Sequence, residues 1–368
     1  MAGSALVSCI TDVPASRRSV LPRAARPALA RAPVVVLVAI DGVRWQEVFE
    51  GVEPAMAKRY GVSRRWVRSA EELTPHLHGI GTRDGCVLGA PGADEGFFAS
   101  GPEFVSLPGY AEMLTGSLHS GCTTNACRNV RIETLVDDFA RPPSAKAEEA
   151  AVISSWPRVE SASSHGGRSG VVSAGRNGGY RLERLRAFPK AYAAFEAGRR
   201  AAAAPGYDDF RPDRFTAELA VSYVAEAQPR FLFVSFGETD EYAHHNRYGA
   251  YLEALHFADA MVGRLRSTLR RLERGGTPTA LLVTTDHGRA YHFTDHGSKW
   301  PESSRSFLFA AGSLISARGR LAGAKRARLA DLAPTVRAIS GLPSREVSGS
   351  GRVLEELLPR PAMWARSR

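Results

Sequence analysis

The sequence predicts an α/β fold with a mostly parallel central sheet flanked by helices. From residue 33 onward, short β-branched and apolar runs alternate with stretches of helical periodicity, and this alternation is typical of a parallel sheet covered by helices. The longest apolar run, VVVLVAI at 34–40, has the length of a strand. The candidate strands are 34–40, 151–156, 170–175, 230–237, 279–285 and 306–312.

The helical segments follow the strands in order. The candidate helices are 109–116, 214–227, 249–273 and 328–340. In the long segment 249–273, apolar residues from Leu252 to Leu265 recur at helical spacing, so this stripe is expected to pack in the core. Glycine-rich stretches at 79–101 and 161–180 are interpreted as long loops or small insertions near the carboxyl edge of the sheet.

Length and composition suit one large domain. A chain of 368 residues with 44% hydrophobic residues can bury a large core, and we expect a single domain over residues 33–368. Residues 1–32 are interpreted as a flexible arm or a degenerate targeting segment, because neither ALVSC nor SRRSVL has the apolar stretch of an export signal. No apolar run approaches the roughly 20 residues that span a bilayer. Localisation stays open, with a periplasmic or secreted protein preferred to a cytoplasmic one.

The chain is basic, with a net charge of +10 that comes largely from arginine, as in residues 264–274. Such a balance can attract nucleic acid, anionic surfaces or phosphorylated substrates. The sequence has no nucleic-acid-binding motif, so arginine-rich solvated faces are the simpler interpretation. Cys122 and Cys127 have the spacing to close a small loop as a disulfide, whereas a zinc site would need a second pair. Nothing in the sequence defines an oligomeric state.

Acidic and imidazole side chains follow three of the predicted strands. The carboxyl ends of strands in an open parallel sheet line the ligand crevice, so these groups are expected to meet at one edge. Six of the ten histidines lie between His244 and His296. The candidate ligands are Asp41, Asp240, His244, Asp286, His287 and His296.

This mixture of donors indicates a binuclear metal centre. Carboxylate and imidazole ligands together suit zinc or manganese, and the set is too large for one tetrahedral ion. Two divalent ions, zinc or alternatively manganese, would stabilise the attacking and leaving oxygens of a displacement at phosphorus. On this interpretation Asp286 and His287 serve one ion and His296 serves the other.

Ser106, in FVSLPGYAEMLTG, is the candidate nucleophile. Pro108 fits the start of a helix, and the positive field of a helix N-terminus favours an alkoxide and the phosphate it would attack. The alternative is that Ser106 serves only as a helix N-cap. Thr115 is a competing hydroxyl, but it lies at the far end of the predicted helix, where the dipole opposes an alkoxide.

These segments resemble the alkaline phosphatase superfamily, and most closely its nucleotide pyrophosphatase/phosphodiesterase-like branch. VVVLVAIDGVRWQEVF is similar to the opening strand and Asp-Gly-x-Arg motif of that branch, and SLPGYAEMLTG to its nucleophile segment. TDEYAH resembles its Asp-x-x-x-His motif, and TTDHG with the later HG resembles its final ligands. LADLAPTVRAISGLP at 329–343 is similar to a late helix of the superfamily. The resemblance extends from about residue 33 to 358 with its motifs in order.

The resemblance implies roles for individual residues. Ser106 would form a covalent phosphoserine that water then hydrolyses. Asn125 stands where relatives place an asparagine that binds a phosphate oxygen, and Arg44 or Arg128 could replace the phosphate-binding arginine of the alkaline phosphatases. One ion would be held by Asp41, Ser106, Asp286 and His287, and the other by Asp240, His244 and His296.

Other residues near the motifs have simpler interpretations. Tyr110 stands where the sulfatase motif C/S-x-P-x-R has its arginine, which argues against sulfatase chemistry. Glu238 is a candidate for orienting a ligand. His245 is interpreted as solvated or as a neighbour of the ligands. The loop residues Arg289, His292 and Asp295 have substrate contact only as an alternative.

The sequence therefore predicts a two-metal hydrolase of phosphate esters, either a phosphomonoesterase or a phosphodiesterase, acting on a phosphorylated small molecule. A phosphotransferase or mutase of the same superfamily is the first alternative, because it would share the phospho-enzyme. A catalytically silent metal-binding relative is the second, and the presence of every expected ligand and of the nucleophile argues against it.

Overall fold

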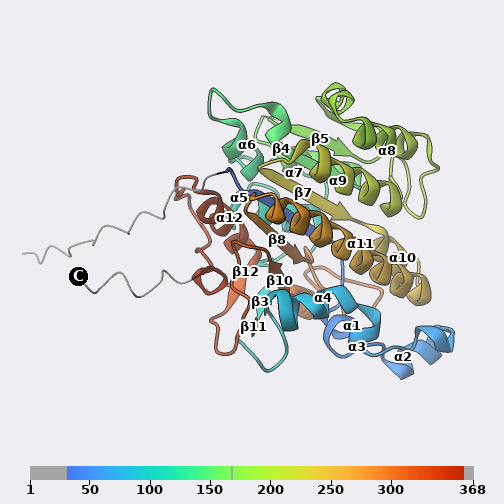
Figure 1. The fold of residues 1–368 in the computed structure, drawn as a ribbon. Coiled ribbons are helices and arrows are strands. Elements are labelled where there is room, and N and C mark those ends of the chain that lie inside the picture. Colours follow the sequence, from blue (N-terminus) through green and yellow to red (C-terminus); the bar gives the residue numbers. More distant parts are fainter. Residues whose placement is uncertain (1–30, 167–168, 360–368) are drawn as a thin grey trace, which may run out of the picture.

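The computed structural model describes residues 31–166 and 169–359 of the chain, and a nine-stranded sheet forms its centre (Figure 1). Strands β8, β1, β7, β4 and β5 run parallel, and β10 and β6 are antiparallel to their neighbours. In sheet order the strands are β11 (Gly319–Arg320), β2 (Gly85–Leu88), β10 (Leu308–Ala311), β8 (Thr279–Thr284), β1 (Val34–Ile40), β7 (Phe231–Phe236), β4 (Ala150–Ser154), β5 (Val171–Ala174) and β6 (Gly178–Tyr180). The predicted α/β class with a mostly parallel sheet is confirmed.

Both faces of the sheet are buried. In β1, Val36 and Val38 belong to one hydrophobic cluster, and Val35 and Leu37 to the other, because successive strand side chains point to opposite faces. Helices α9 and α11 contribute to the first cluster and lie in front of the sheet in Figure 1, whereas α5 and α12 contribute to the second. The helices are α1 (Trp45–Phe49), α2 (Pro54–Arg59), α3 (Ala70–Leu73), α4 (Pro75–Gly79), α5 (Ser106–Thr115), α6 (Leu135–Ala140), α7 (Glu160–Ser163), α8 (Pro189–Arg200), α9 (Asp213–Ala227), α10 (Glu238–His244), α11 (Tyr248–Arg274) and α12 (Leu332–Ser340).

Two predicted helices differ from the structure at their ends. The helix predicted at 109–116 begins at Ser106, and the one predicted at 328–340 is a 3-10 turn at Leu329–Asp331 followed by α12. Both stretches interpreted as long loops or small insertions contain strands of the main sheet: 79–101 contains β2, and 161–180 contains β5 and β6. The stretch 79–101 also contains β3 (Phe97–Phe98). β3 lies in a second, three-stranded sheet between β12 (Ala327–Arg328) and β9 (Arg305–Ser306).

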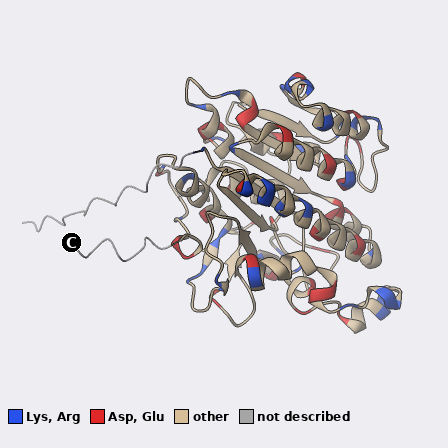
Figure 2. Cartoon of the chain, viewed as in Figure 1, with Lys and Arg blue, Asp and Glu red and all other residues tan. Residues whose placement is uncertain are grey.

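The basic residues lie on helices such as α2, α8 and α11 and on the loops between elements (Figure 2). On α11, Arg264 forms an ion pair with Glu218 of α9, and Arg270 pairs with Asp84. Exposed ion pairs of this kind contribute little to stability but fit the interpretation of arginine-rich solvated faces. Among the helices of the described ranges, none has both the length and the hydrophobicity of a membrane span. Almost all of the predicted arm, residues 1–32, lies outside the described residues.

Candidate metal centre

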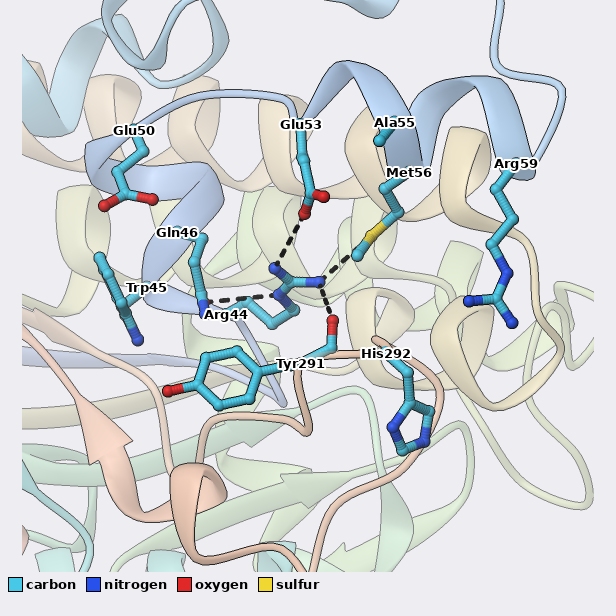
Figure 3. Close-up of a pocket in the computed structure, with 10 residues that line it drawn as sticks. All are labelled: Arg44, Trp45, Gln46, Glu50, Glu53, Ala55, Met56, Arg59, Tyr291 and His292. Carbon is cyan, nitrogen blue, oxygen red and sulfur yellow. Dashed lines mark hydrogen bonds and ion pairs between the residues drawn. The ribbon is translucent and has the colours of Figure 1, made fainter.

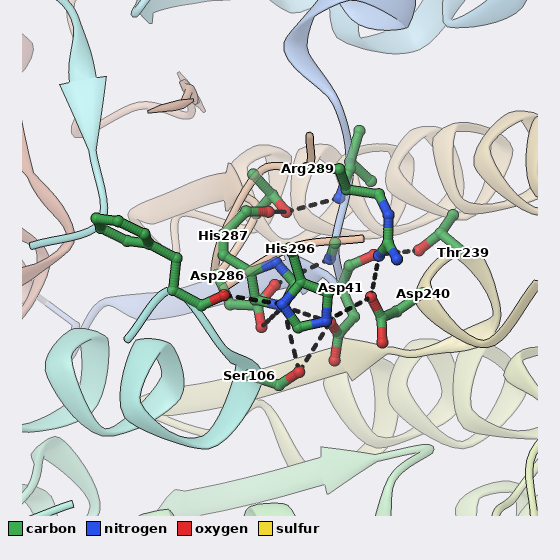
Figure 4. A network of polar contacts seen from close by, with 12 residues as sticks. Asp41, Ser106, Thr239, Asp240, Asp286, His287, Arg289 and His296 are labelled. Carbon is green, nitrogen blue, oxygen red and sulfur yellow. Dashed lines mark hydrogen bonds and ion pairs between the residues drawn. The ribbon is translucent and has the colours of Figure 1, made fainter. Parts of the chain in front are cut away.

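Three adjacent strands deliver the candidate ligands to one edge of the sheet (Figure 4). Asp41 directly follows β1, and Asp286 comes two residues after β8. The short helix α10 follows β7 and carries Asp240 and His244 four residues apart. Residues at this spacing lie on the same helix face, so both side chains reach the same place.

The first ligand group consists of Asp41, Asp286 and His287, and all three side chains are buried. The Nε2 atom of His287 lies 3.5 Å from Asp41 Oδ1 and 3.4 Å from Asp286 Oδ2. The His287 Nδ1 atom lies 2.8 Å from the carbonyl oxygen of Gly288. A proton on Nδ1 would donate to this carbonyl and leave Nε2 as a free metal ligand.

The charges of the first group favour a bound cation. Burial and the nearby charges of Asp286 and Asp240 raise the pKa of Asp41 well above its usual value, and burial raises the pKa of Asp286 to about 7. Burial also lowers the pKa of His287 to about 4, so its imidazole is neutral. The Oδ2 atom of Asp286 is buried without a hydrogen-bond donor. These residues therefore fit a divalent ion, which would satisfy this oxygen and offset both carboxylate charges.

The second group consists of Asp240, His244 and His296. His244 Nε2 lies 3.0 Å from Asp240 Oδ2 and 3.1 Å from His296 Nε2. His296 Nδ1 lies 2.8 Å from the carbonyl oxygen of Phe104, and burial lowers the pKa of His296 to about 3. The structure thus brings Asp41, Asp286 and His287 into one group and Asp240, His244 and His296 into the other.

Ser106 lies beside the first group. Its hydroxyl donates to Asp41 Oδ1 at 3.2 Å, and its Oγ lies 3.3 Å from His287 Nε2. Ser106 is the first residue of α5; the N-cap is Val105, and no side-chain cap is formed. The alternative that Ser106 is only an N-cap is therefore wrong. The Thr115 hydroxyl donates to the carbonyl of Ala111 within the helix.

Two further side chains, Tyr110 and Arg289, contact the candidate ligands, and the sequence did not predict them as part of the centre. The hydroxyl of Tyr110, one turn after Ser106, donates to Asp41 Oδ2 at 2.6 Å. The buried guanidinium of Arg289 contacts Asp240 Oδ1. The spacing of four between Ser106 and Tyr110 places both on one helix face, and that signal could have identified the tyrosine.

A pocket of about 320 Å³ opens onto both groups. Its walls include Ser106, Asp41, Asp240, His244 and Asn125. The Oδ1 atom of Asn125 accepts a hydrogen bond from the backbone N–H of Leu107 at 2.9 Å. This contact ties the loop that follows α5 to the start of the same helix.

Arg44 lies in a different place (Figure 3). It lines a separate pocket of about 530 Å³ with Tyr291 and His292. Its guanidinium donates to the carbonyl of Tyr291 at 3.0 Å and lies 3.4 Å from the buried carboxylate of Glu47. Within the described ranges, none of the contacts of its side chain is with a candidate metal ligand. The structure thus does not bring Arg44 to the centre, because Glu47 holds its side chain elsewhere.

The other candidates also have local partners. Glu238 accepts a hydrogen bond from the backbone N–H of Asp213, and burial with the charge of Asp213 raises its pKa to about 8. His292 pairs with Asp295 at 2.7 Å on a partly exposed loop. Cys122 and Cys127 form a disulfide in the loop after α5.

Comparison with known proteins gives a coarse assignment. The model of the Metalloenzyme superfamily matches residues 209–303, which include α10 and both Asp-His-Gly segments. A curated 2,3-bisphosphoglycerate-independent phosphoglycerate mutase from Synechococcus elongatus is 29% identical over 152 residues, covering 38% of this chain and 26% of that enzyme. The match thus spans about a quarter of that relative.

Solved structures match over most of the chain. A phosphonate monoester hydrolase from Silicibacter pomeroyi has a TM-score of 0.55 at 14% identity, covering 90% of this chain and 78% of that one. A protein in the alkaline phosphatase superfamily from Vibrio parahaemolyticus has a TM-score of 0.55 at 12% identity, with 90% and 72% covered. Murine ectonucleotide pyrophosphatase/phosphodiesterase 5 has 0.54 at 12%, with 89% and 100% covered. The superfamily model thus matches the segment that carries Asp240, His244, Asp286, His287 and His296, and the solved structures show that the chain shares their fold.

Proposed function

We propose that this chain hydrolyses phosphate esters of small molecules at two divalent ions, with Ser106 as the nucleophile. The observation that carries the proposal is the shared pocket, onto which Ser106 and members of both ligand groups open. Zinc is the proposed metal and manganese the alternative, because mixed carboxylate and imidazole donors suit both. Bound ions would supply the positive charge that stabilises the attacking and leaving oxygens at phosphorus.

In the proposed reaction, Ser106 Oγ attacks phosphorus while the bond from phosphorus to the ester oxygen breaks. The released alcohol leaves a phosphoserine, and a water then attacks phosphorus and breaks the bond to Oγ. The position of Ser106 as the first residue of α5 supports this role, because the helix N-terminus favours the negative charge that develops there. The hydroxyl proton faces Asp41 Oδ1.

Asn125 is proposed to bind a phosphate oxygen. Because its Oδ1 accepts from Leu107, its amide NH₂ group is free to donate, and that nitrogen has no hydrogen-bond partner among the described residues. Trp156 and Tyr207 line the same pocket and offer apolar surface to the organic part of an ester. Placement in the nucleotide pyrophosphatase/phosphodiesterase-like branch belongs to the proposal and is supported by the order of the four motifs.

The proposal is tested by trapping the intermediate. Rapid quenching with a ³²P-labelled ester should place the label on the peptide that contains Ser106. Ser106→Ala should abolish turnover and labelling with its metal content unchanged, whereas the matched control Thr115→Val should keep both. A panel of monoesters, diesters and sulfate esters defines the substrate. Label on another residue contradicts the proposal, and delivery of the labelled phosphate to an added alcohol in preference to water indicates a phosphotransferase or mutase.

A further inference from the structure

The two ligand groups differ in the charges that contact them. In the first group, hydrogen bonds to the carboxylates come from neutral donors, namely the hydroxyls of Ser106 and Tyr110 and the backbone N–H of Gly42. In the second group, a permanent cation, Arg289, contacts the only carboxylate, Asp240. The presence of Arg289 therefore adds to the difference between the two sets of ligands.

Arg289 is held in place by the loop that it begins. Its Nε donates to the carbonyl of Phe293 at 2.6 Å, and its Nη2 donates to the carbonyl of Thr294 at 2.8 Å. Its Nη1 faces Asp240 Oδ1 (Figure 4). Each nitrogen of the guanidinium thus has a hydrogen-bond acceptor, and the loop continues along the chain to His296. Arg289 thus fixes both Asp240 and the approach to a second ligand of the same group.

The backbone next to Asp41 is shaped to admit this pair. Gly42 has a φ of +60°, and a Cβ atom there would overlap Asp240 Oδ1 and lie 2.6 Å from Arg289 Nη1. A side chain at this position would therefore displace the pair, in addition to being strained. Only a glycine at position 42 thus leaves room for the contact between Asp240 and Arg289 on this side.

The two ligand groups also differ in net charge. The first group offers two carboxylates and one imidazole. The second offers one carboxylate and two imidazoles, and Arg289 offsets the single negative charge. Affinity for a divalent cation rises with the negative charge of its ligands, and a buried guanidinium repels a nearby cation strongly. The side chain of His244 is also 45% exposed, so the second group is open to solvent.

We propose that Arg289 is a built-in counter-charge for Asp240 that makes the Asp240, His244 and His296 site the weaker and more readily exchanged of the two metal sites. In the metal-free protein, Arg289 compensates the buried carboxylate, and a bound ion must share that carboxylate with it. The inference rests on the proposed two-metal centre. It assigns to Arg289 a positioning role, because the side chain acts through Asp240.

The stepwise affinities of the metal-free protein for Mn²⁺, measured by isothermal titration calorimetry, test this inference. Two binding steps are expected, of which Asp240→Asn removes the weaker and Asp41→Asn the tighter. Arg289→Met should tighten the weaker step by at least about tenfold, because the repulsion is gone. Arg337→Met is the matched control: it removes another buried arginine paired with a carboxylate, Asp138, and should leave both steps unchanged.

Thermal unfolding gives a readout that does not need activity. Metal-free Arg289→Met should unfold at a lower temperature than wild type, since Asp240 loses its partner, and Mn²⁺ should raise that temperature by more than it does in wild type. A weaker second step in Arg289→Met, loss of the tighter step in Asp240→Asn, or two equal steps in wild type would each overturn the inference and leave the proposed function standing. Absence of any binding of Mn²⁺ or Zn²⁺ would overturn both.

Discussion

Tyr110→Phe removes the one hydroxyl through which Tyr110 contacts the first ligand group and keeps the aromatic ring. That hydroxyl donates to Asp41 Oδ2 at 2.6 Å and accepts from Ser235 Oγ at 3.1 Å. The ring is fully buried and packs edge-on against Phe233, with the centroids 5.8 Å apart. Phenylalanine keeps this packing, so the substitution isolates the hydrogen bond to a candidate metal ligand.

The size of the effect follows from that bond. A hydrogen bond to a charged group contributes about 1.5–3 kcal/mol, which corresponds to roughly 10–100-fold in affinity for an ion that needs Asp41 ionised. The bond also lowers the pKa of Asp41, against the stronger effect of burial that raises it. Its loss therefore favours the protonated carboxyl, which competes with the metal.

Calorimetric titration of the metal-free variant with Zn²⁺ measures this loss. The tighter of the two binding steps is expected to weaken by about 10–100-fold and the other to stay close to wild type. Tyr223→Phe is the matched control, since the hydroxyl of that buried tyrosine donates to the carbonyl of Glu148 at 2.8 Å, away from the ligands. If the affinity of the tighter step is unchanged in Tyr110→Phe, the argument that this hydroxyl supports Asp41 as a ligand is refuted.

Three further predictions concern binding and stability. Asn125→Ala should lower kcat/KM by roughly 10–100-fold through loss of one hydrogen bond to a charged phosphate, with metal content unchanged; equal rates for variant and wild type would exclude that bond. Burial raises the pKa of Glu112 to about 7 from the usual 4.5, so the folded state binds the carboxyl proton more tightly than the unfolded state does. The proton therefore stabilises the folded state below pH 4.5, and this stabilisation is lost as the pH rises to 7. Urea unfolding of wild type should therefore lose about 3 kcal/mol across that window relative to Glu112→Gln, and parallel pH curves would contradict this. Dialysis against EDTA should lower the melting temperature and Zn²⁺ should restore it; a melting temperature insensitive to both would mean that no ion is bound.

The sequence predicts much of this architecture because the determining signals are local. The run at 34–40 coincides with β1, and the rule that strand carboxyl ends share an edge brings Asp41, Asp240 and Asp286 together. Strand β2 escaped prediction because four residues among glycines carry no measurable period.

The parts of the site that the sequence did not predict depend on tertiary packing. Arg289 reaches Asp240 only because the loop carbonyls of Phe293 and Thr294 turn its guanidinium inward, and no sequence spacing encodes that path. Arg44 was expected near substrate, yet the buried carboxylate of Glu47 is what fixes its direction. The sequence thus predicts least well which charged side chains pair with one another in the folded structure.

Anomalous diffraction from crystals grown with Zn²⁺ tests the central claim most directly. The account predicts two peaks, one among Asp41, Asp286 and His287 and the other among Asp240, His244 and His296, with Ser106 Oγ facing the first. At limiting Zn²⁺ the first peak should be the stronger. A single peak shared by both groups, or zinc bound only elsewhere on the protein, would contradict the account.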